Sequence, residues 1–247
     1  MSALHIIVKS GPALEKLARA KTFAFDKTGT LTENQLIVDQ VVTDDKSFDQ
    51  KELQSLAASV EQQSSHVIAS SLVKATDKDL IHPVTNLKET TAQGVEGDVD
   101  GKHVKVGKLS FVAPGHEKLN VTSTAVYVSV DGKFAGYITL KDKMRPESPK
   151  TIERLRLQGA EDIMMLTGDH KQVAEKVAKE AGITDVRSEL LPSQKIQAIK
   201  DVPKDLRPVV MTGDGVNDAP SLTAADVGIA MGAKGATAAS ESADAVI

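Results

Sequence analysis

The sequence predicts an α/β domain with a doubly wound parallel sheet, split by an inserted α+β domain with an antiparallel sheet. Two observations lead to this prediction. Four short apolar runs alternate with helical patterns, as strands and helices do in parallel sheets covered on both faces. A central region of different character separates the first run from the other three. We expect residues 1–33 and 141–247 to form the α/β domain and residues 34–140 to form the insert.

The four apolar runs have the length and composition of buried strands, and turns rich in Gly, Thr or Asp follow them. Three of these strands bring an aspartate just beyond their C-terminal ends. Open α/β sheets place their sites at that edge, so we expect the functional site there. The expected strands are 22–25, 162–166, 208–211 and 226–230, and the expected helices are 149–157, 170–180 and 193–200.

The insert is predicted from two helical patterns, at residues 47–60 and 64–75, followed mostly by β-type runs. Asp-Gly pairs stand between such runs at Asp100-Gly101 and Asp131-Gly132. This dipeptide favours the tight turns of β-hairpins, which indicates an antiparallel sheet. The two connections to the α/β domain, near residues 32–34 and 140–146, are expected to form a hinge.

Composition excludes several classes of function. The net charge of −4 is mixed along the chain, and only 3% of the residues are aromatic, with no tryptophan. Neither a basic surface nor a base-stacking platform is therefore expected, which argues against a nucleic-acid partner. The chain has no cysteine. Disulfides, thiol nucleophiles and cysteine-ligated metals are thereby excluded from it.

The ends of the chain suggest a piece of a longer protein. No apolar run approaches the roughly 20 residues that span a bilayer. Charged residues from Lys9 to Arg19 interrupt the N-terminal region early, unlike a signal peptide. Residues 3–8 and 245–247 are apolar stubs without the polar residues usual at natural termini. We therefore expect both ends to be cuts.

The strongest motif is Asp26-Lys27-Thr28-Gly29-Thr30-Leu31-Thr32. An aspartate at a strand end can attack phosphorus while the backbone N–H groups of the following turn hold the phosphate oxygens. All seven residues match the phosphorylation motif of P-type ATPases, and the chain resembles that family. The resemblance implies a haloacid-dehalogenase-like α/β domain in which Asp26 takes up the phosphoryl group, with Lys27 and Thr28 in the catalytic loop.

Three later segments supply what phosphoryl transfer needs, which is mainly positioning and neutralisation of charge. Thr167-Gly168-Asp169 offers a hydroxyl and a backbone amide, and Lys195 offers a positive charge. Carboxylates able to hold a divalent cation occur in the last segment. That segment is Thr212-Gly213-Asp214-Gly215-Val216-Asn217-Asp218-Ala219-Pro220.

The resemblance implies a role for each of these residues. Asp26, the backbone carbonyl of Thr28 and Asp214 are expected to hold Mg²⁺. The phosphate is expected to bind to Thr167, Gly168 and Lys195, with Asp169 completing the Thr-Gly-Asp motif. Asn217 and Asp218 are expected to orient the cluster.

Thr28 also indicates which reaction the site performs. Phosphatases on this scaffold carry a second aspartate two residues after the nucleophile, which protonates the leaving group and then activates water. Thr28 occupies that position here. An aspartyl-phosphate at Asp26 would therefore be hydrolysed slowly, which favours a transport ATPase over a phosphatase.

The insert is expected to bind the nucleotide. Heavy-metal-transporting members of the family carry a glutamate followed by Ser-Glu-His-Pro at a helix start. Here Glu61 and His66 match this pattern, while Ser65 and Val67 replace the second glutamate and the proline. A literal His-Pro pair occurs at His82-Pro83, but it lacks the upstream glutamate and lies in a connection. We therefore favour His66, whose flat imidazole can stack on a purine or form a hydrogen bond with it.

The family's glycine-rich nucleotide motif is matched in part. Gly94 and Val95 correspond to the second glycine and the aliphatic residue of the motif Gly-x-Gly-aliphatic, in which Ala92 replaces the first glycine. Gly97 corresponds to a later glycine of the family. Gly107 matches the glycine of a following Gly-Asn pair, in which Lys108 replaces the asparagine. These matches imply that Gly94, Val95, Gly97 and Gly107 contact the nucleotide.

The sequence as a whole predicts the ATP-hydrolysing catalytic portion of a membrane metal-cation pump of the heavy-metal class. The implied cofactors are Mg²⁺ and ATP. Implied partners are a transported metal cation, carried by membrane helices outside this chain, and an actuator domain. The segment is thus expected to be a cytoplasmic domain of an integral membrane protein. Two alternatives stay open: a stand-alone haloacid-dehalogenase-like phosphatase and a catalytically silent nucleotide-binding module.

Overall fold

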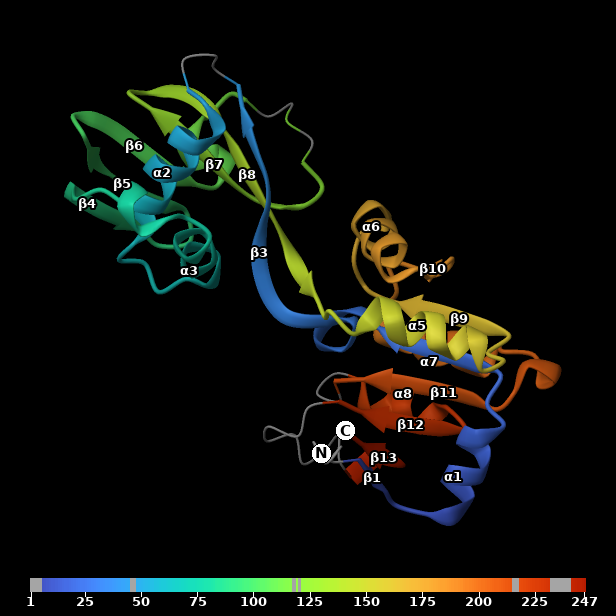
Figure 1. Cartoon of the computed structure of the whole chain (residues 1–247). Helices are drawn as coiled ribbons and strands as arrows, with labels where there is room; N and C mark the ends of the chain where they lie inside the picture. The colour runs from blue at the N-terminus through green and yellow to red at the C-terminus, as the bar shows by residue number, and fades with distance from the viewer. Residues whose placement is uncertain (1–5, 45–47, 117–118, 120, 215–217, 232–240) are drawn as a thin grey trace. The chain divides into compact units, whose positions relative to one another are not determined.

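The computed structural model describes residues 6–44, 48–116, 119, 121–214, 218–231 and 241–247 (Figure 1). The chain forms two compact units. Unit 1 combines Met1–Asn34 with Met144–Ile247, and unit 2 is Gln35–Lys143. Among the described residues, no helix has both the length and the apolar character needed to cross a membrane.

Unit 1 is built on a seven-stranded sheet in the order β1-β13-β12-β11-β2-β9-β10. All neighbouring strands are parallel except β1 and β13 at one edge. The predicted parallel α/β sheet is confirmed, although three short strands, β1, β10 and β13, had no counterpart in the prediction. The strands are β1 (Ile7–Val8), β2 (Thr22–Asp26), β9 (Asp162–Leu166), β10 (Asp185–Arg187), β11 (Val209–Gly213), β12 (Val227–Ala230) and β13 (Ala245–Val246).

Helices pack on both faces of this sheet. Side chains of successive strand residues point to opposite faces. Ala24 of β2 therefore joins a core with α7 (Pro192–Lys200) and α8 (Ala219–Ala224), while Phe25 joins a core with α5 (Ser148–Leu157) and α6 (Lys171–Ala181). Burial on both faces explains why the strands are continuous apolar runs without polar alternation.

Two helices of unit 1 are delimited by capping residues that a sequence can indicate. The short helix α1 (Gly11–Ala18) begins at Ser10, whose hydroxyl accepts a hydrogen bond from the Ala13 amide at 3.3 Å. Such N-caps satisfy one of the amides that a helix start leaves unpaired. Helix α6 ends at Gly182, which adopts the left-handed conformation with φ 79°. A glycine tolerates this conformation without a steric penalty.

Unit 2 contains a six-stranded sheet in the order β3-β8-β7-β6-β5-β4, in which the pairs from β8 to β4 are antiparallel. The predicted α+β insert with an antiparallel sheet is confirmed. Its elements are β3 (Thr32–Thr43), α2 (Gln50–Glu61), α3 (Val67–Lys74), β4 (Val84–Thr90), β5 (Gly94–Val99), β6 (Lys102–Gly107), α4 (Leu109–Val112), β7 (Thr124–Val130) and β8 (Lys133–Met144).

Both predicted hairpin turns are present. Asp100 and Gly101 join β5 to β6 with φ 49° and 76°, and Asp131 and Gly132 join β7 to β8 with φ 50° and 75°. Two consecutive positive φ values define the type I′ turn, whose twist matches that of the paired strands. The turns therefore set the registers of these two hairpins.

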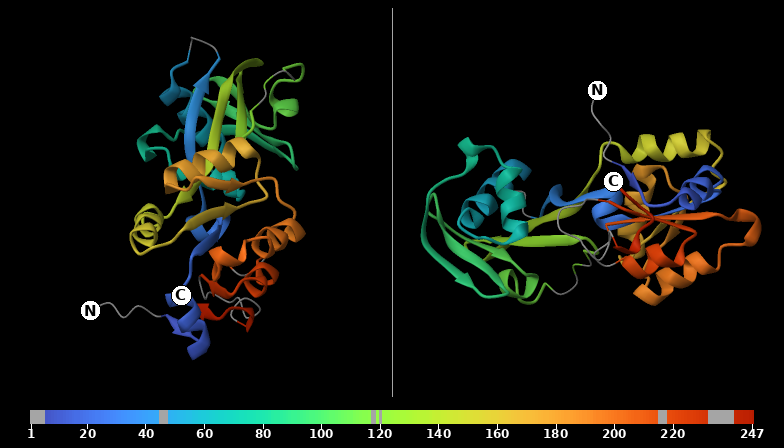
Figure 2. Two further views of the ribbon diagram at one scale, coloured as in Figure 1. Left: turned by 90° about the vertical axis from the view of Figure 1, so that its right-hand side faces the viewer. Right: turned by 90° about the horizontal axis from the view of Figure 1, so that it is seen from below.

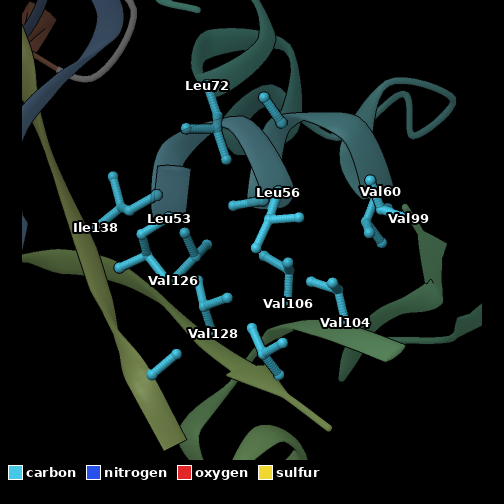
Figure 3. Close-up of a cluster of buried hydrophobic side chains, with 14 of the residues drawn as sticks. Leu53, Leu56, Val60, Leu72, Val99, Val104, Val106, Val126, Val128 and Ile138 are labelled. Atoms are coloured by element: carbon cyan, nitrogen blue, oxygen red, sulfur yellow. The ribbon is translucent and has the colours of Figure 1, made fainter. Parts of the chain in front are cut away.

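Helices α2 and α3 lie on one face of this sheet, as the view from below shows (Figure 2). Leu53, Leu56 and Val60 of α2 point towards the valines of the strands (Figure 3). Leu72 of α3 is buried in the same cluster. This core supplies the apolar burial that allows the insert to form a compact unit of its own.

Strands β3 and β8 extend across the boundaries between the units. Each has twelve residues, and the two lie side by side in the sheet (Figure 1). The sequence predicts connections near residues 32–34 and 140–146, but it does not predict a strand of the length of β3. Polar residues at exposed and half-buried positions of β3 hide the alternation by which strands are recognised.

Candidate active site

The carboxyl ends of β11, β2 and β9 meet at one edge of the unit 1 sheet. These three strands are direct neighbours, and Asp26 at the end of β2 stands opposite Leu166 of β9. On the other side, Phe25 stands opposite Thr212 of β11. The segments after all three strands therefore begin at the same edge, where polar groups can converge on one site.

Asp26, Lys195 and Asp218 form the centre of this site. The Lys195 ammonium lies 2.5 Å from Asp26 Oδ1 and 3.2 Å from Asp218 Oδ1. Both carboxylates are nearly enclosed, with exposed fractions of 6% for Asp26 and 2% for Asp218. Lys195 lies in the first turn of α7, which begins at Pro192. Proline suits the first position of a helix, and this start places the ammonium against the strand ends.

The charges at the site are unbalanced towards the negative. Burial, followed by the nearby Asp218, raises the pKa of Asp26 from 3.8 to about 6, although Lys195 opposes the shift and Asp214 adds to it. Burial also raises the pKa of Asp218. Burial alone would lower the pKa of Lys195, but the two carboxylates outweigh it and raise that pKa. The Lys195 ammonium thus faces two carboxylates, and a third, that of Asp214, lies near enough to raise the pKa of both.

This excess of carboxylate fits a divalent cation. The side chain of Asp214 lies against the loop after Asp26, because a Cβ added to Gly29 would be 2.9 Å from Asp214 Oδ2. In the described ranges, no group of three or more Asp, Glu or His side chains could by itself hold a metal ion. A cation here would therefore also use backbone carbonyl or water oxygens, as Mg²⁺ commonly does.

A second ion pair links the loop after β2 to the loop after β9. Lys27 is buried, and its ammonium lies 2.6 Å from Asp169 Oδ2. The amide of Asp169 donates in turn to the Thr167 hydroxyl at 3.1 Å. That hydroxyl accepts this bond and retains its own hydrogen for donation. Lys27 and Asp169 thereby hold the Thr-Gly-Asp loop beside the end of β2.

Gly168 and Lys195 line a cavity of about 220 Å³ in unit 1. Its remaining walls include Leu190 and Pro220. Two of the residues predicted to bind phosphate, Gly168 and Lys195, are thus brought to the same cavity. Of the predicted catalytic residues, Asn217 lies outside the described part of the chain.

Unit 2 has a separate cavity of about 310 Å³. Five of the six residues predicted to contact a nucleotide line it: Glu61, His66, Gly94, Val95 and Gly107. Most of its wall is apolar, with a few polar groups, which is typical of small-molecule sites. The sixth residue, Gly97, is not among the lining residues. A Cβ at Gly97 would lie 2.6 Å from Val84 Cγ1, so this glycine serves the packing of β4 on β5.

His66 caps α3 at the edge of this cavity. Its Nδ1 accepts a hydrogen bond from the Ile68 amide at 3.4 Å. In the neutral imidazole the proton then resides on Nε2, which is available to donate to a ligand. His82, the other histidine considered, pairs with Asp100 at 2.9 Å and does not line this cavity.

Glu61 is the buried acid of the cavity, with an exposed fraction of 6%. Burial, followed by the charge of Glu89, raises its pKa from 4.5 to about 7, while a hydrogen bond with Ser64 opposes the shift. Glu89 and Lys108 also line the cavity, and sequence reasoning did not single them out as ligand contacts. The half-matched Gly-Asn pair already marked Lys108, whereas no local pattern distinguishes Glu89 from a solvated strand residue.

Comparison with known proteins identifies the family. A family model described as haloacid dehalogenase-like hydrolase matches residues 20–226. The zinc-transporting ATPase of Bacillus subtilis is 37% identical over 98% of this chain and 39% of its own length. The manganese-exporting P-type ATPase of Mycobacterium tuberculosis is 35% identical over 98% of the chain and 36% of its own length. The chain thus spans less than two fifths of these curated relatives.

Solved structures agree with these matches. The crystal structure of a zinc-transporting PIB-type ATPase superposes with a TM-score of 0.85 and 32% identity, over 98% of this chain and 40% of that one. The catalytic domain of the CPx-ATPase CopB-B, studied for its conformational changes upon nucleotide binding, gives a TM-score of 0.69 and 32% identity. That match covers 98% of this chain and 90% of the CopB-B domain. The chain therefore belongs to the haloacid dehalogenase-like hydrolases and, within them, is the catalytic region of a heavy-metal P-type ATPase of the CPx class.

Proposed function

We propose that this chain is the ATP-hydrolysing portion of a metal-cation pump and that Asp26 accepts the γ-phosphoryl group of ATP. One observation carries the proposal. A buried aspartate at a central strand end lies 2.5 Å from Lys195, with two further acids, Asp218 and Asp214, beside it. A nucleophile, an ammonium and a set of metal-binding carboxylates are the groups that phosphoryl transfer requires.

In the proposed reaction, a carboxylate oxygen of Asp26 forms a bond to the γ-phosphorus. The bond from that phosphorus to the β–γ bridging oxygen breaks, and ADP leaves with the electron pair on that oxygen. Lys195 orients the attacking carboxylate and offsets its charge, while the Thr167 hydroxyl and the Gly168 amide donate to the phosphoryl oxygens. Asp26, the Thr28 carbonyl and Asp214 would hold Mg²⁺, which when bound neutralises charge on the transferred group.

Nucleotide binding is assigned to the cavity of unit 2. The apolar wall suits a purine base, with Glu61 accepting from or donating to its polar edge and His66 Nε2 donating to it. Because Asp26 belongs to unit 1, transfer requires the bound nucleotide to bring its γ-phosphate to Asp26. We propose that the connections formed by β3 and β8 permit this as a hinge.

The absence of an acid two residues after the nucleophile supports a pump over a phosphatase. Thr28 can neither protonate a leaving group nor activate water, so the aspartyl-phosphate should persist long enough to drive another process. The relatives are named as exporters or transporters of manganese, zinc and cadmium. We accordingly propose that the transported ion is a heavy-metal cation carried by membrane helices of the full-length protein, and that an actuator domain assists dephosphorylation. In this proposal the chain lies on the cytoplasmic side of the membrane.

The proposal is tested with γ-labelled ATP, an acid quench and a chromogenic phosphate ester. The expected result is an acid-stable, Mg²⁺-dependent phosphoprotein, saturable ATP binding and slow hydrolysis of both substrates. Rapid turnover of the ester would instead identify a stand-alone phosphatase. Saturable ATP binding without any phosphoprotein would identify a silent nucleotide-binding module.

Glu61 makes the stability of unit 2 depend on pH. Its pKa is about 7 in the folded state against 4.5 for an ordinary glutamate. The folded state therefore binds a proton that the unfolded state lacks between these pH values, and stability falls as the pH rises through this window. The loss amounts to at most about 3 kcal/mol. Glu61→Gln should remove this loss, so the variant should be more stable than wild type at pH 8 but not at pH 4.5.

Urea denaturation of both proteins at the two pH values measures this difference, and Glu89→Gln serves as the control for an exposed acid beside the same cavity. The control should change the pH dependence less, because Glu89 contributes less than burial to the pKa of Glu61. Equal stability of wild type and Glu61→Gln at pH 8 would contradict the assignment. ATP affinity should fall in Glu61→Gln even though the fold is stabilised at pH 8. Glu61 is the proposed partner of the purine's polar edge, and buried acids in binding sites commonly serve function at a cost in stability.

A further inference from the structure

Arg145 holds the loop that follows Asp26. It donates from its backbone amide to the Leu31 carbonyl at 2.9 Å, from Nε to the Thr30 carbonyl at 2.9 Å and from Nη2 to the Gly29 carbonyl at 3.1 Å. Three consecutive carbonyls thus share one residue as their donor. Ser148 adds a bond from its hydroxyl to the Leu31 carbonyl at 3.0 Å.

The loop needs such outside donors because its backbone is irregular. Thr28 has φ −76° and ψ 127°, and Gly29 has φ 74° and ψ −8°, so neither residue continues a helix. Buried carbonyls that lack a regular partner must find another donor. A guanidinium presents several N–H groups in one rigid plane, and it can therefore fix two neighbouring carbonyls in one relative orientation.

Two residues of this loop bear on phosphoryl transfer. Gly29, whose carbonyl Arg145 holds, is the residue against which Asp214 packs. Thr28 precedes it directly, and its carbonyl is the proposed backbone ligand of Mg²⁺. The Thr28 carbonyl belongs to the peptide bond that Thr28 forms with Gly29, so a displacement of Gly29 would move both this carbonyl and the contact with Asp214. Arg145 itself follows the last residue of β8, which extends from unit 2.

We propose that Arg145 is a positioning residue for phosphoryl transfer, which keeps the loop from Lys27 to Leu31 in its place between Asp26 and Asp214. The inference rests on the proposed function, because it assigns the loop's geometry a role in forming the phosphoprotein. Arg145 does not touch the reacting atoms in this assignment. It acts through the carbonyls that it binds.

The test compares Arg145→Met and Arg145→Lys with a matched control, Arg207→Met. Arg207 also donates to consecutive carbonyls, those of Ile199 at 2.8 Å and Lys200 at 3.3 Å, and it pairs with Asp226 at 2.9 Å. It lies just before β11, at the opposite end of that strand from the site. The control therefore loses comparable hydrogen bonds in unit 1 without disturbing the loop.

Arg145→Met should lower the maximal rate of phosphoprotein formation by roughly 10- to 100-fold, since a small displacement of reacting groups has effects of that order. The Mg²⁺ concentration for half-maximal phosphorylation should rise, while ATP affinity at the unit 2 cavity should stay unchanged. Arg145→Lys should fall between wild type and Arg145→Met, because one ammonium replaces the fork only in part. Arg207→Met should lower the melting temperature and leave the rate near that of wild type when both are measured well below that temperature.

Amide hydrogen exchange gives a readout that needs no reaction. Exchange of residues 27–32 should accelerate in Arg145→Met and not in Arg207→Met. The inference is overturned if Arg145→Met keeps the wild-type rate and Mg²⁺ dependence, or if both variants lose phosphorylation and loop protection to the same degree. If wild type itself forms no phosphoprotein, the proposed function fails. The inference about Arg145 is overturned separately if residues 27–32 of Arg145→Met exchange their amide hydrogens at the wild-type rate.

Discussion

Asp26→Asn is expected to form no phosphoprotein from labelled ATP under conditions in which wild type is labelled to completion. The amide lacks the negative charge and the nucleophilic oxygen of the carboxylate, and no neighbouring group can replace them at the same position. Lys195 would also lose the charged partner that lies 2.5 Å away. ATP affinity should remain unchanged because the cavity lined by Glu61 and His66 belongs to unit 2.

Acid-quenched labelling and an ATP titration of the same preparation measure these two expectations. Asp226→Asn is the matched control. This substitution also removes a charged partner, because Asp226 pairs with Arg207 at 2.9 Å, but Asp226 lies at the opposite end of the sheet from the site. Unit 1 should not be destabilised by Asp26→Asn at neutral pH without metal, because burial and neighbouring acids already disfavour the charge of Asp26. An acid-stable phosphoprotein in Asp26→Asn would remove the central assignment.

Gly29→Ala is expected to reduce phosphoprotein formation by at least about tenfold. Two causes combine. An alanine at φ 74° carries the penalty of the left-handed conformation, about 1 kcal/mol. Its Cβ would also lie 2.9 Å from Asp214 Oδ2, so that side chain must move away from the loop after Asp26. The Mg²⁺ requirement should rise, because Asp214 is a proposed ligand of that cation.

Gly101→Ala separates these two causes. Gly101 has φ 76°, nearly the same as Gly29, but nothing lies within 4 Å of a Cβ added there. It should therefore show the conformational cost in the stability of unit 2 and leave phosphorylation unchanged. Labelling rates at several Mg²⁺ concentrations, together with melting temperatures, measure both effects. If Gly101→Ala lowered the rate as much as Gly29→Ala, contact with Asp214 would not be the reason for the glycine.

Sequence reasoning located the strands that carry the site because buried parallel strands have a local pattern. The apolar runs that end at Asp26, Thr167 and Thr212 are visible without any knowledge of their neighbours. The apolar runs do not show that these strands are neighbours in the order β11-β2-β9. That order depends on the path of the whole chain. Glycine positions were similarly ambiguous, since Gly94 lines the cavity whereas Gly97 makes room for Val84.

The α/β sheet, the antiparallel insert and the polar residues at the strand ends were predicted from local features alone. These features are the residue types, their spacing and the hairpin turns. Partnerships over long separations depended on the folded backbone: Lys195 with Asp26, Lys27 with Asp169, and Arg145 with the Gly29 and Thr30 carbonyls. Burial likewise decided the pKa values of Asp26 and Glu61, because desolvation depends on atoms that come from every part of a unit. The fold class and the candidate residues were therefore predicted from the sequence, while the geometry and electrostatics of the proposed site arose only when distant segments packed together.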